Sequence, residues 1–210
     1  MKINRFSVFI LFLVFTSFFG CFLYAEADAV ADESSGKIYT DPDHKYSITP
    51  PDGWTEVAPG KIPAEIIEKL PDNLKQIIKN GSPAEVMFMY FGSDKFLGSN
   101  LNIINVVQAA GIEFNDFTFN LFKSEIIKSY NQMVTEGYQM LDNRMIEING
   151  IKSAYFENRF TLDGQVFNNI QVCIASSYGM FILTYTVMGG ALDDTSKAMV
   201  AKSYNTFTVL

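Results

Sequence analysis

The stretch that decides the fold spans residues 138–188 and reads YQMLDNRMIEINGIKSAYFENRFTLDGQVFNNIQVCIASSYGMFILTYTVM. Runs rich in β-branched and aromatic residues are separated by Asn149-Gly150 and Asp163-Gly164, the dipeptides that two-residue hairpins with positive φ require. A third turn is expected at residues 177–179. The stretch therefore predicts an antiparallel meander of consecutive strands.

Side chains in this stretch alternate with period two, which predicts a sheet with one apolar face and one wet face. The apolar side must be covered by the rest of the chain. The expected apolar side holds Ala154, Phe156, Phe160, Leu162, Val166, Ile170, Val172, Ile174, Phe181, Leu183, Tyr185 and Val187, and the expected wet side holds Ser153, Glu157, Arg159, Thr161, Gln165, Asn169 and Gln171.

A long helix over residues 115–136 is expected to supply that cover. Its apolar residues recur at helical spacing and form one continuous stripe, with Lys, Glu and Gln elsewhere. Asn115 or Asp116 can cap its start, and Gly137 ends it.

The flanking regions predict shorter elements. Trp54 follows two prolines and an Asp-Gly turn, so it is expected to fold back on the sheet as a plug. Together the pattern predicts an α+β domain, an antiparallel meander covered by helices. The shorter elements are strands over residues 37–40 and 46–49, two helices over 62–80, strands over 84–91 and 101–107, a helix from 193 or 194 to about 203, and a strand or tail over 207–210.

Length and charge limit the class of protein. A chain of 210 residues without a break in composition predicts one domain, over residues 37–210. The net charge is −7, and removal of residues 1–25, which hold Lys2, Arg5 and no acid, leaves 14 basic and 23 acidic side chains, or −9. Such an acidic chain is poorly suited to nucleic acid and to anionic lipid surfaces.

The N-terminus predicts export to the periplasm, the cell surface or the extracellular space. Residues 1–25 have the positive start, apolar core and small residues of a signal peptide, and residues 26–36 have the composition of a flexible acidic tether. Cleavage is expected near residues 25–29. Gly20-Cys21 leaves a second possibility open, in which Cys21 is lipidated and becomes the mature N-terminus. An uncleaved anchor is a third, although the apolar run is short for a membrane span.

Residues for catalysis are sparse. The single histidine, His44, excludes a multi-histidine zinc site, and with Asp41 and Asp43 it forms a weak candidate for a mixed carboxylate-imidazole metal site. The same turn is explained more simply by an aspartate that caps its own backbone. Cys173 lies in mid-strand, opposite in direction to its neighbours, and is expected to be a packed residue. No cofactor motif is present.

Two segments resemble the PsbP-like family: YSITPPDGW at residues 46–54 and AKSYNTFTV at residues 201–209, placed around the meander and long helix. That group includes extrinsic photosystem II subunits, a nuclear transport factor and bacterial envelope lipoproteins. The resemblance implies an α/β/α sandwich. It also implies an accessory or binding role, because members are mostly not catalysts.

The functional expectation is an exported, non-enzymatic envelope protein that binds a protein, a peptide or a small ligand without a cofactor. Contact with a membrane is expected only through an N-terminal anchor. Two alternatives stay open: an enzyme whose carboxylates are scattered in sequence but gathered in a cleft, and a structural envelope protein tethered by lipid at Cys21.

Overall fold

The computed structural model describes residues 36–43, 45–57, 86–90, 99–133, 136–162, 165–188 and 192–210. The predicted export segment, the predicted tether up to residue 35 and the predicted helices over 62–80 lie outside these residues. The elements in chain order are β1 (Tyr39–Thr40), β2 (Tyr46–Ile48), β3 (Trp54–Val57), β4 (Val86–Tyr90), β5 (Asn100–Val106), the 3-10 helix η1 (Val107–Ala109), α4 (Asp116–Met133), β6 (Glu136–Ile148), β7 (Ile151–Leu162), β8 (Gln165–Ser176), β9 (Gly179–Met188), α5 (Asp194–Tyr204) and β10 (Thr208–Val209).

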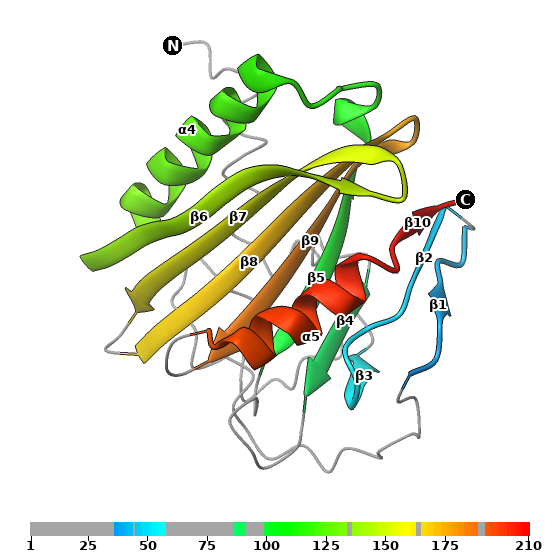
Figure 1. The fold of residues 1–210 in the computed structure, drawn as a ribbon, viewed down its shortest axis with the longest axis horizontal. Coiled ribbons are helices and arrows are strands. Elements are labelled where there is room, and N and C mark those ends of the chain that lie inside the picture. Colours follow the sequence, from blue (N-terminus) through cyan, green and yellow to red (C-terminus); the bar gives the residue numbers. More distant parts are fainter. Residues whose placement is uncertain are drawn as a thin grey trace, which may run out of the picture.

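A seven-stranded antiparallel sheet forms the centre of the molecule, in the order β3-β4-β5-β9-β8-β7-β6 (Figure 1). The meander is confirmed as β6 to β9. Its first hairpin turns at Asn149 and Gly150, with φ of 48° and 81°, the left-handed values that this dipeptide tolerates. A smaller sheet, β1-β2-β10, pairs the two ends of the domain.

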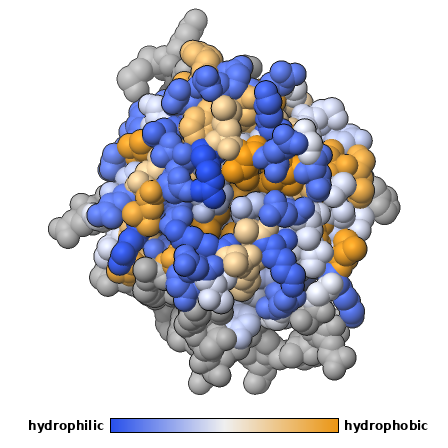
Figure 2. Space-filling model, in the orientation of Figure 1, coloured by the Kyte–Doolittle hydropathy of each residue, from blue (hydrophilic) through white to orange (hydrophobic). Residues whose placement is uncertain are grey.

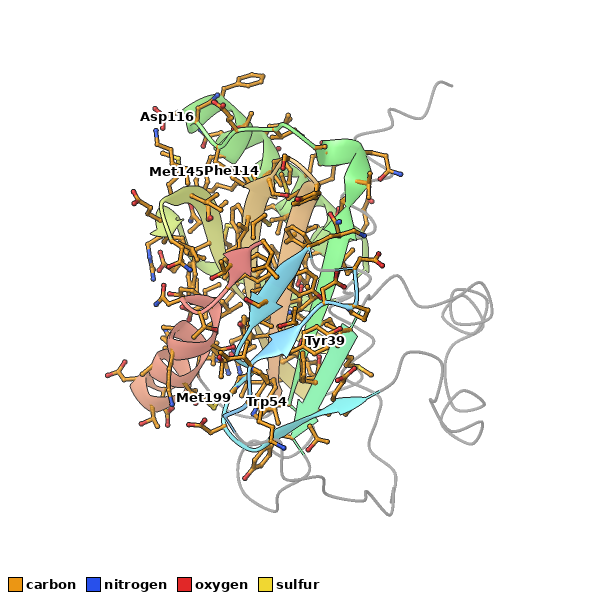
Figure 3. All side chains as sticks on the ribbon, turned by 90° about the vertical axis from the view of Figure 1, so that its right-hand side faces the viewer. Tyr39, Trp54, Phe114, Asp116, Met145 and Met199 are labelled. Atoms are coloured by element: carbon orange, nitrogen blue, oxygen red, sulfur yellow. The ribbon has the colours of Figure 1, made fainter. Side chains whose placement is uncertain are left out.

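The two expected covering helices are confirmed, but α4 ends at Met133, and Glu136 and Gly137, which were expected at its end, begin β6. Asn115 caps α4, since its Oδ1 accepts hydrogen bonds from the backbone N–H groups of Phe117 and Thr118, both at 3.0 Å. Asp193 caps α5 by accepting from the N–H of Ser196 at 2.8 Å. Figure 1 shows α5 lying across the strands, and Figure 3 shows Phe114 and Asp116, at the start of α4, at the opposite end of the molecule from Trp54.

The two helices cover opposite faces of the sheet. On one face, Phe122, Ile126 and Tyr130 of α4 pack against alternate residues of β7, β8 and β9. Ring pairs tie the layers together: Phe119 stacks on Phe156 at 5.3 Å between centroids, and Tyr130 stacks on Tyr138 at 4.6 Å.

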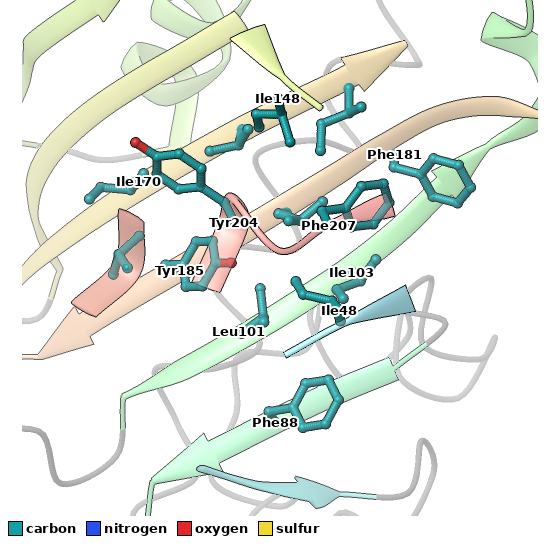
Figure 4. Packing of buried hydrophobic residues seen from close by; sticks show 14 of the residues in the cluster. Ile48, Phe88, Leu101, Ile103, Ile148, Ile170, Phe181, Tyr185, Tyr204 and Phe207 are labelled. Atoms are coloured by element: carbon teal, nitrogen blue, oxygen red, sulfur yellow. The ribbon is translucent and has the colours of Figure 1, made fainter. Parts of the chain in front are cut away.

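The other face packs against α5 and the small sheet (Figure 4). Phe181 lies at 5.0 Å from the ring of Tyr46 and 5.2 Å from that of Phe207. Trp54 is buried in the same core, as the predicted plug, although it also begins β3, a strand that was not predicted. This core therefore joins both ends of the domain to the meander.

The prediction of a single apolar face was wrong. Phe156 lies in the core under α4, whereas Ile170 and Leu183 lie in the core under α5. The predicted wet residues Glu157 and Gln171 are buried. The physical reason is that each strand also carries apolar residues of the opposite parity, such as Tyr155, Cys173 and Ile182, so both faces bury apolar area.

The remaining surface is mixed. Figure 2 shows mainly hydrophilic residues on the face that carries α5, with hydrophobic side chains near its centre. Among the described helices, none combines the length and the apolar character that a bilayer crossing needs. Among the described residues, the exposed large hydrophobic side chains are Ile38, Val107, Phe117, Leu141, Met145, Tyr178 and Leu210.

Candidate functional site

The residues predicted for a metal site are engaged in their turn where the structure describes them. The Oδ2 of Asp41 accepts from the backbone N–H of Lys45 at 3.2 Å, and the Asp41 N–H donates to the carbonyl of Tyr46 at 3.0 Å. Asp43 forms an ion pair with Lys45 at 2.9 Å. The metal site stays a prediction because His44 lies outside the described residues. Cys21, the predicted lipidation site, also lies outside them. No metal-ligand group of three or more His, Cys, Asp or Glu forms within the described ranges.

Cys173 is confirmed as a packed residue. It is fully buried in the core under α4, and burial raises the pKa of its thiol to about 12. A thiolate is the reactive form of cysteine, so this side chain is inert at neutral pH.

Polar side chains form a compact group on the same face of the sheet as α4. The group reaches from β7 to β5, toward the edge of the sheet formed by β3 and β4. Alternation places Asn100 and Asn102 of β5 on the face opposite Leu101 and Ile103, which belong to the α5 core. On β9, Thr184 and Thr186 continue the side of Ile182, and on β8, Asn169 and Gln171 continue the side of Cys173. Asn158 of β7 completes the group, which we call the amide-hydroxyl ladder.

The strand register aligns the ladder in two straight rows across five strands. One row runs Met87, Asn102, Thr184, Gln171 and Phe156. The other row runs Met89, Asn100, Thr186, Asn169 and Asn158. Neighbouring strands lie about 5 Å apart, so the four polar members of the second row span about 15 Å.

The ladder is buried and uncharged. Its seven polar side chains are 0–1% exposed, and none of them ionises. Burying an amide or hydroxyl without a hydrogen bond costs about 1–3 kcal/mol in proteins. The hydrogen bonds of the ladder therefore decide whether it serves only the fold.

Some of those hydrogen bonds are made within the ladder. The Nδ2 of Asn102 donates to the Oδ1 of Asn100 at 2.8 Å, and the Nδ2 of Asn169 donates to the Oγ1 of Thr186 at 3.3 Å. Tyr138 Oη donates to the Oδ1 of Asn158 at 2.9 Å.

Within the part of the chain that the structure describes, Asn158 Nδ2, Asn169 Oδ1 and Thr184 Oγ1 of the ladder have no hydrogen-bond partner. They lie on three adjacent strands, and Asn158 is directly opposite Asn169. The group supplies a donor, an acceptor and a hydroxyl that can do either. A molecule that offers an acceptor to Asn158 Nδ2 and a donor to Asn169 Oδ1 would satisfy both atoms.

The sequence analysis missed this site because it assigned Asn169 and Gln171 to the wet face. One signal pointed the other way. The strand containing Met87 and Met89 was apolar on both faces, which predicts a sheet covered on both sides. Polar residues inside such a sheet are buried rather than solvated.

The opposite face carries a different polar group, around Glu157. This predicted wet residue is buried, and it pairs with Lys197 of α5 at 2.8 Å while its Oε2 accepts from Tyr155 Oη at 3.3 Å. The Arg144 guanidinium lies 4.1 Å from the centroid of the Tyr155 ring. Burial raises the pKa of Tyr155 well above the usual value for a phenol, and the negative charge of Glu157 adds to the rise. The Lys197–Glu157 ion pair joins α5 to the sheet, and the contacts of Tyr155 lie within the sheet.

Comparison with known proteins rests on structure alone, because the sequence matches no protein-family model and no curated protein. The solution structure of cyanobacterial PsbP (CyanoP) from Synechocystis sp. PCC 6803 is similar, with a TM-score of 0.53 and 14% identity, over 89% of this chain and 99% of that one. A mutant of protein Mog1 aligns over 82% of this chain and 95% of its own, with a TM-score of 0.49 and 9% identity.

LpqN of Mycobacterium tuberculosis, described as involved in cell envelope biogenesis, aligns over 82% of this chain and 89% of its own, with a TM-score of 0.43 and 12% identity. At such identities a likeness shows the fold and no function. With its seven-stranded antiparallel sheet between α4 and α5, the described part of the chain has the PsbP-like fold that the sequence resemblance predicted.

Proposed function

We propose that this protein is an exported, non-enzymatic binding protein of the cell envelope that holds a small ligand against the amide-hydroxyl ladder. The observation that carries the proposal is the group of three buried atoms, Asn158 Nδ2, Asn169 Oδ1 and Thr184 Oγ1, without a partner among the described residues. Burying each such atom without a hydrogen bond costs free energy. A ligand that satisfies all three recovers that free energy on binding.

The chemistry of the surrounding side chains supports binding over catalysis. Burial raises the pKa of Cys173 to about 12, and it raises the pKa of Tyr138, next to the ladder, well above the usual value for a phenol. Both groups therefore stay protonated at neutral pH. The ladder itself offers hydrogen bonds and no acid or base.

The place of action follows from the N-terminal segment. Residues 1–25 have the layout of a signal peptide, and the acidic balance of the remaining chain opposes adsorption to nucleic acid and anionic lipid. Mass spectrometry of the mature N-terminus tests this step. Cleavage near residues 25–29 gives a freely exported protein, a diacylglyceryl group on Cys21 gives a lipid-anchored one, and retention of Met1 contradicts export by signal cleavage.

The binding role is tested on the full chain, produced with its own export segment and purified from the compartment to which it is delivered. Because the ladder side chains are 0–1% exposed, a ligand reaches them only when the protein opens locally, and its release is expected to be slow. Denaturation of the purified protein should therefore release one small molecule in near-stoichiometric amount, detected by mass spectrometry.

The matched control is the double variant Asn169→Leu with Thr184→Val, which removes two of the three atoms. It should release much less of that molecule at equal protein amount. The proposal is wrong if the wild-type protein releases nothing and binds none of the small molecules offered to it.

A further inference from the structure

The polar atoms of the ladder restrict what the ligand can be. We infer that the ligand is uncharged where it meets the sheet and presents a hydrogen-bond acceptor and a donor on neighbouring groups, as vicinal hydroxyls or a carboxamide do. This inference rests on the proposed function. It names the chemical class that the site selects.

The donor and acceptor pattern is the first step. Asn158 Nδ2 can only donate and Asn169 Oδ1 can only accept, and these two residues face each other across the β7–β8 pair. Opposite residues in an antiparallel pair lie about 5 Å apart. A ligand that satisfies both must therefore offer an acceptor and a donor within about that distance. The hydroxyl of Thr184, on the next strand, can donate to an acceptor of the ligand or accept from a donor.

The absence of charge is the second step. Neither row of the ladder contains an ionisable side chain, and its seven polar residues are 0–1% exposed. An ion transferred to such a site loses its hydration and meets no countercharge in the ladder. Carboxylates, phosphates and ammonium groups are selected against at this position, whereas neutral amides and hydroxyls exchange one set of hydrogen bonds for another.

The ends of the rows are the third step. Met87 and Met89 lie at the β4 end, and Phe156 ends the first row at β7. Methionine adapts its shape to an apolar partner, and an aromatic ring offers a flat apolar face. The site thus combines a polar centre with apolar ends. Two sources share this chemistry: a neutral sugar, with hydroxyls above a C–H face, and a peptide unit, with its amide between side chains.

The experiment compares neutral and charged probes by calorimetry on the purified exported protein, which is first unfolded in urea, freed of any co-purified molecule and refolded. The neutral probes are methyl glucoside, which offers hydroxyls, and N-acetylalanine N-methylamide, which offers amides. The charged probes are glucuronate and glucosamine. At least one neutral probe is expected to bind tenfold or more tightly than both charged probes, and the neutral probe that binds identifies the source.

Variants tie that binding to the ladder. Thr184→Val is nearly isosteric and removes an Oγ1 that makes no hydrogen bond within the described chain, so the protein should fold normally. We expect it to weaken binding of the neutral probe about tenfold. Thr161→Val is the matched control, since Thr161 lies on β7 in the row opposite Val166 and outside the ladder, and it should bind as the wild type does.

The outcomes separate the two proposals. Equal or tighter binding of a charged probe, a released ligand that is ionised, or unchanged binding in Thr184→Val overturns the ligand class while leaving a binding protein. Release of no molecule together with no binding of any probe overturns the binding function itself. A released neutral ligand with hydroxyl or amide groups, lost in Thr184→Val, supports both.

Discussion

The two faces of the central sheet use their buried polar groups differently. On the α5 face, Tyr185 Oη donates to Ser203 Oγ at 3.0 Å, and Ser203 Oγ donates to the Thr49 carbonyl at 2.8 Å. On the α4 face, Asn169 and Thr184 keep one polar atom each without a partner among the described residues. Trp54 Nε1 in the α5 core also lacks a partner among the described residues, but it belongs to the edge strand β3. On the α4 face, Asn158, Asn169 and Thr184 lie on three adjacent strands, so their unpartnered atoms are grouped.

This difference is the reason for placing the proposed binding site on the α4 face. Both faces are buried, so exposure does not separate them. The hydrogen bonding of the buried polar groups separates them. A natural core satisfies its buried polar groups and departs from that rule mainly at functional sites. The experiments below test the comparison, from the largest expected effect to the smallest.

Truncation of the α5 core should cost the most stability. Phe181 is fully buried between the rings of Tyr46 and Phe207, so Phe181→Ala should lower the free energy of unfolding by about 3–5 kcal/mol in urea titration. Phe117→Ala is the control, because that ring is 75% exposed and its loss should change stability by less than about 0.5 kcal/mol. If Phe181→Ala and Phe117→Ala lower the free energy of unfolding equally, the α5 core does not stabilise the fold in the way described.

Removal of the cation that pairs with Glu157 should come next. Lys197→Met leaves a carboxylate that is 4% exposed beside the Tyr155 hydroxyl, and should cost about 1–3 kcal/mol. Lys202→Met breaks the ion pair with Asp52, in which both side chains are exposed, and should cost less than about 1 kcal/mol. A Lys197→Met variant as stable as Lys202→Met would mean that the Glu157 contact does not fasten α5.

The first hairpin of the meander is tied to the C-terminal segment on the α5 side by Asn149, whose Nδ2 donates to the Phe207 carbonyl at 2.7 Å. Asn149→Ala should cost about 2 kcal/mol, from the lost bond and from a left-handed backbone that alanine resists. Asn149→Gly keeps that backbone at low cost and should lose only about 1 kcal/mol. If both variants lose the same amount in thermal unfolding, the backbone conformation contributes nothing.

The buried thiol of Cys173, on the α4 face, is expected to make the protein less stable in alkali. Its pKa rises from 9.0 to about 12 on folding, so the unfolded chain releases the proton first as pH increases. The contribution is constant below pH 9 and is lost between pH 9 and 12, by about 1 kcal/mol from pH 9 to 10. Cys173→Ala should remove that part of the slope in urea titrations at each pH. An unchanged slope between pH 9 and 10 would contradict the buried thiol.

The smallest effects separate two threonines of the ladder itself. Thr186 Oγ1 accepts from Asn169 Nδ2, so Thr186→Val should destabilise the ligand-free protein by about 1 kcal/mol. Thr184 Oγ1 has no partner among the described residues, so Thr184→Val should leave stability unchanged or raise it by up to about 1 kcal/mol. Thermal unfolding of both variants measures the difference. A large loss in Thr184→Val would show that this hydroxyl serves the fold.

Much of the fold was predictable because it depends on local chemistry. Asn149-Gly150 marked a hairpin, Asn115 and Asp193 capped their helices, and Trp54 proved to be a buried plug. Each of these follows from a few neighbouring residues. The ladder could not be predicted in the same way, since it depends on what covers each face of the sheet.

Phe156 and Ile170 show this limit most clearly. Both are apolar and both were expected on one side, yet they occupy opposite cores. Alternation along one strand gives the relative direction of its own side chains, and it leaves the phase between two strands open. That phase is decided by the pairing of Glu157 with Ile170 and of Phe156 with Gln171.

The amino-acid sequence by itself determined the meander, its first hairpin turn, the two capped helices and the kinship of fold with PsbP, because turns, caps and periodicity act over a few residues. Only the tertiary structure decided that both faces are buried and that Asn158, Asn169 and Thr184 share one buried region of three adjacent strands. Strand register brings together residues far apart in the chain, and no local pattern encodes which of them become neighbours.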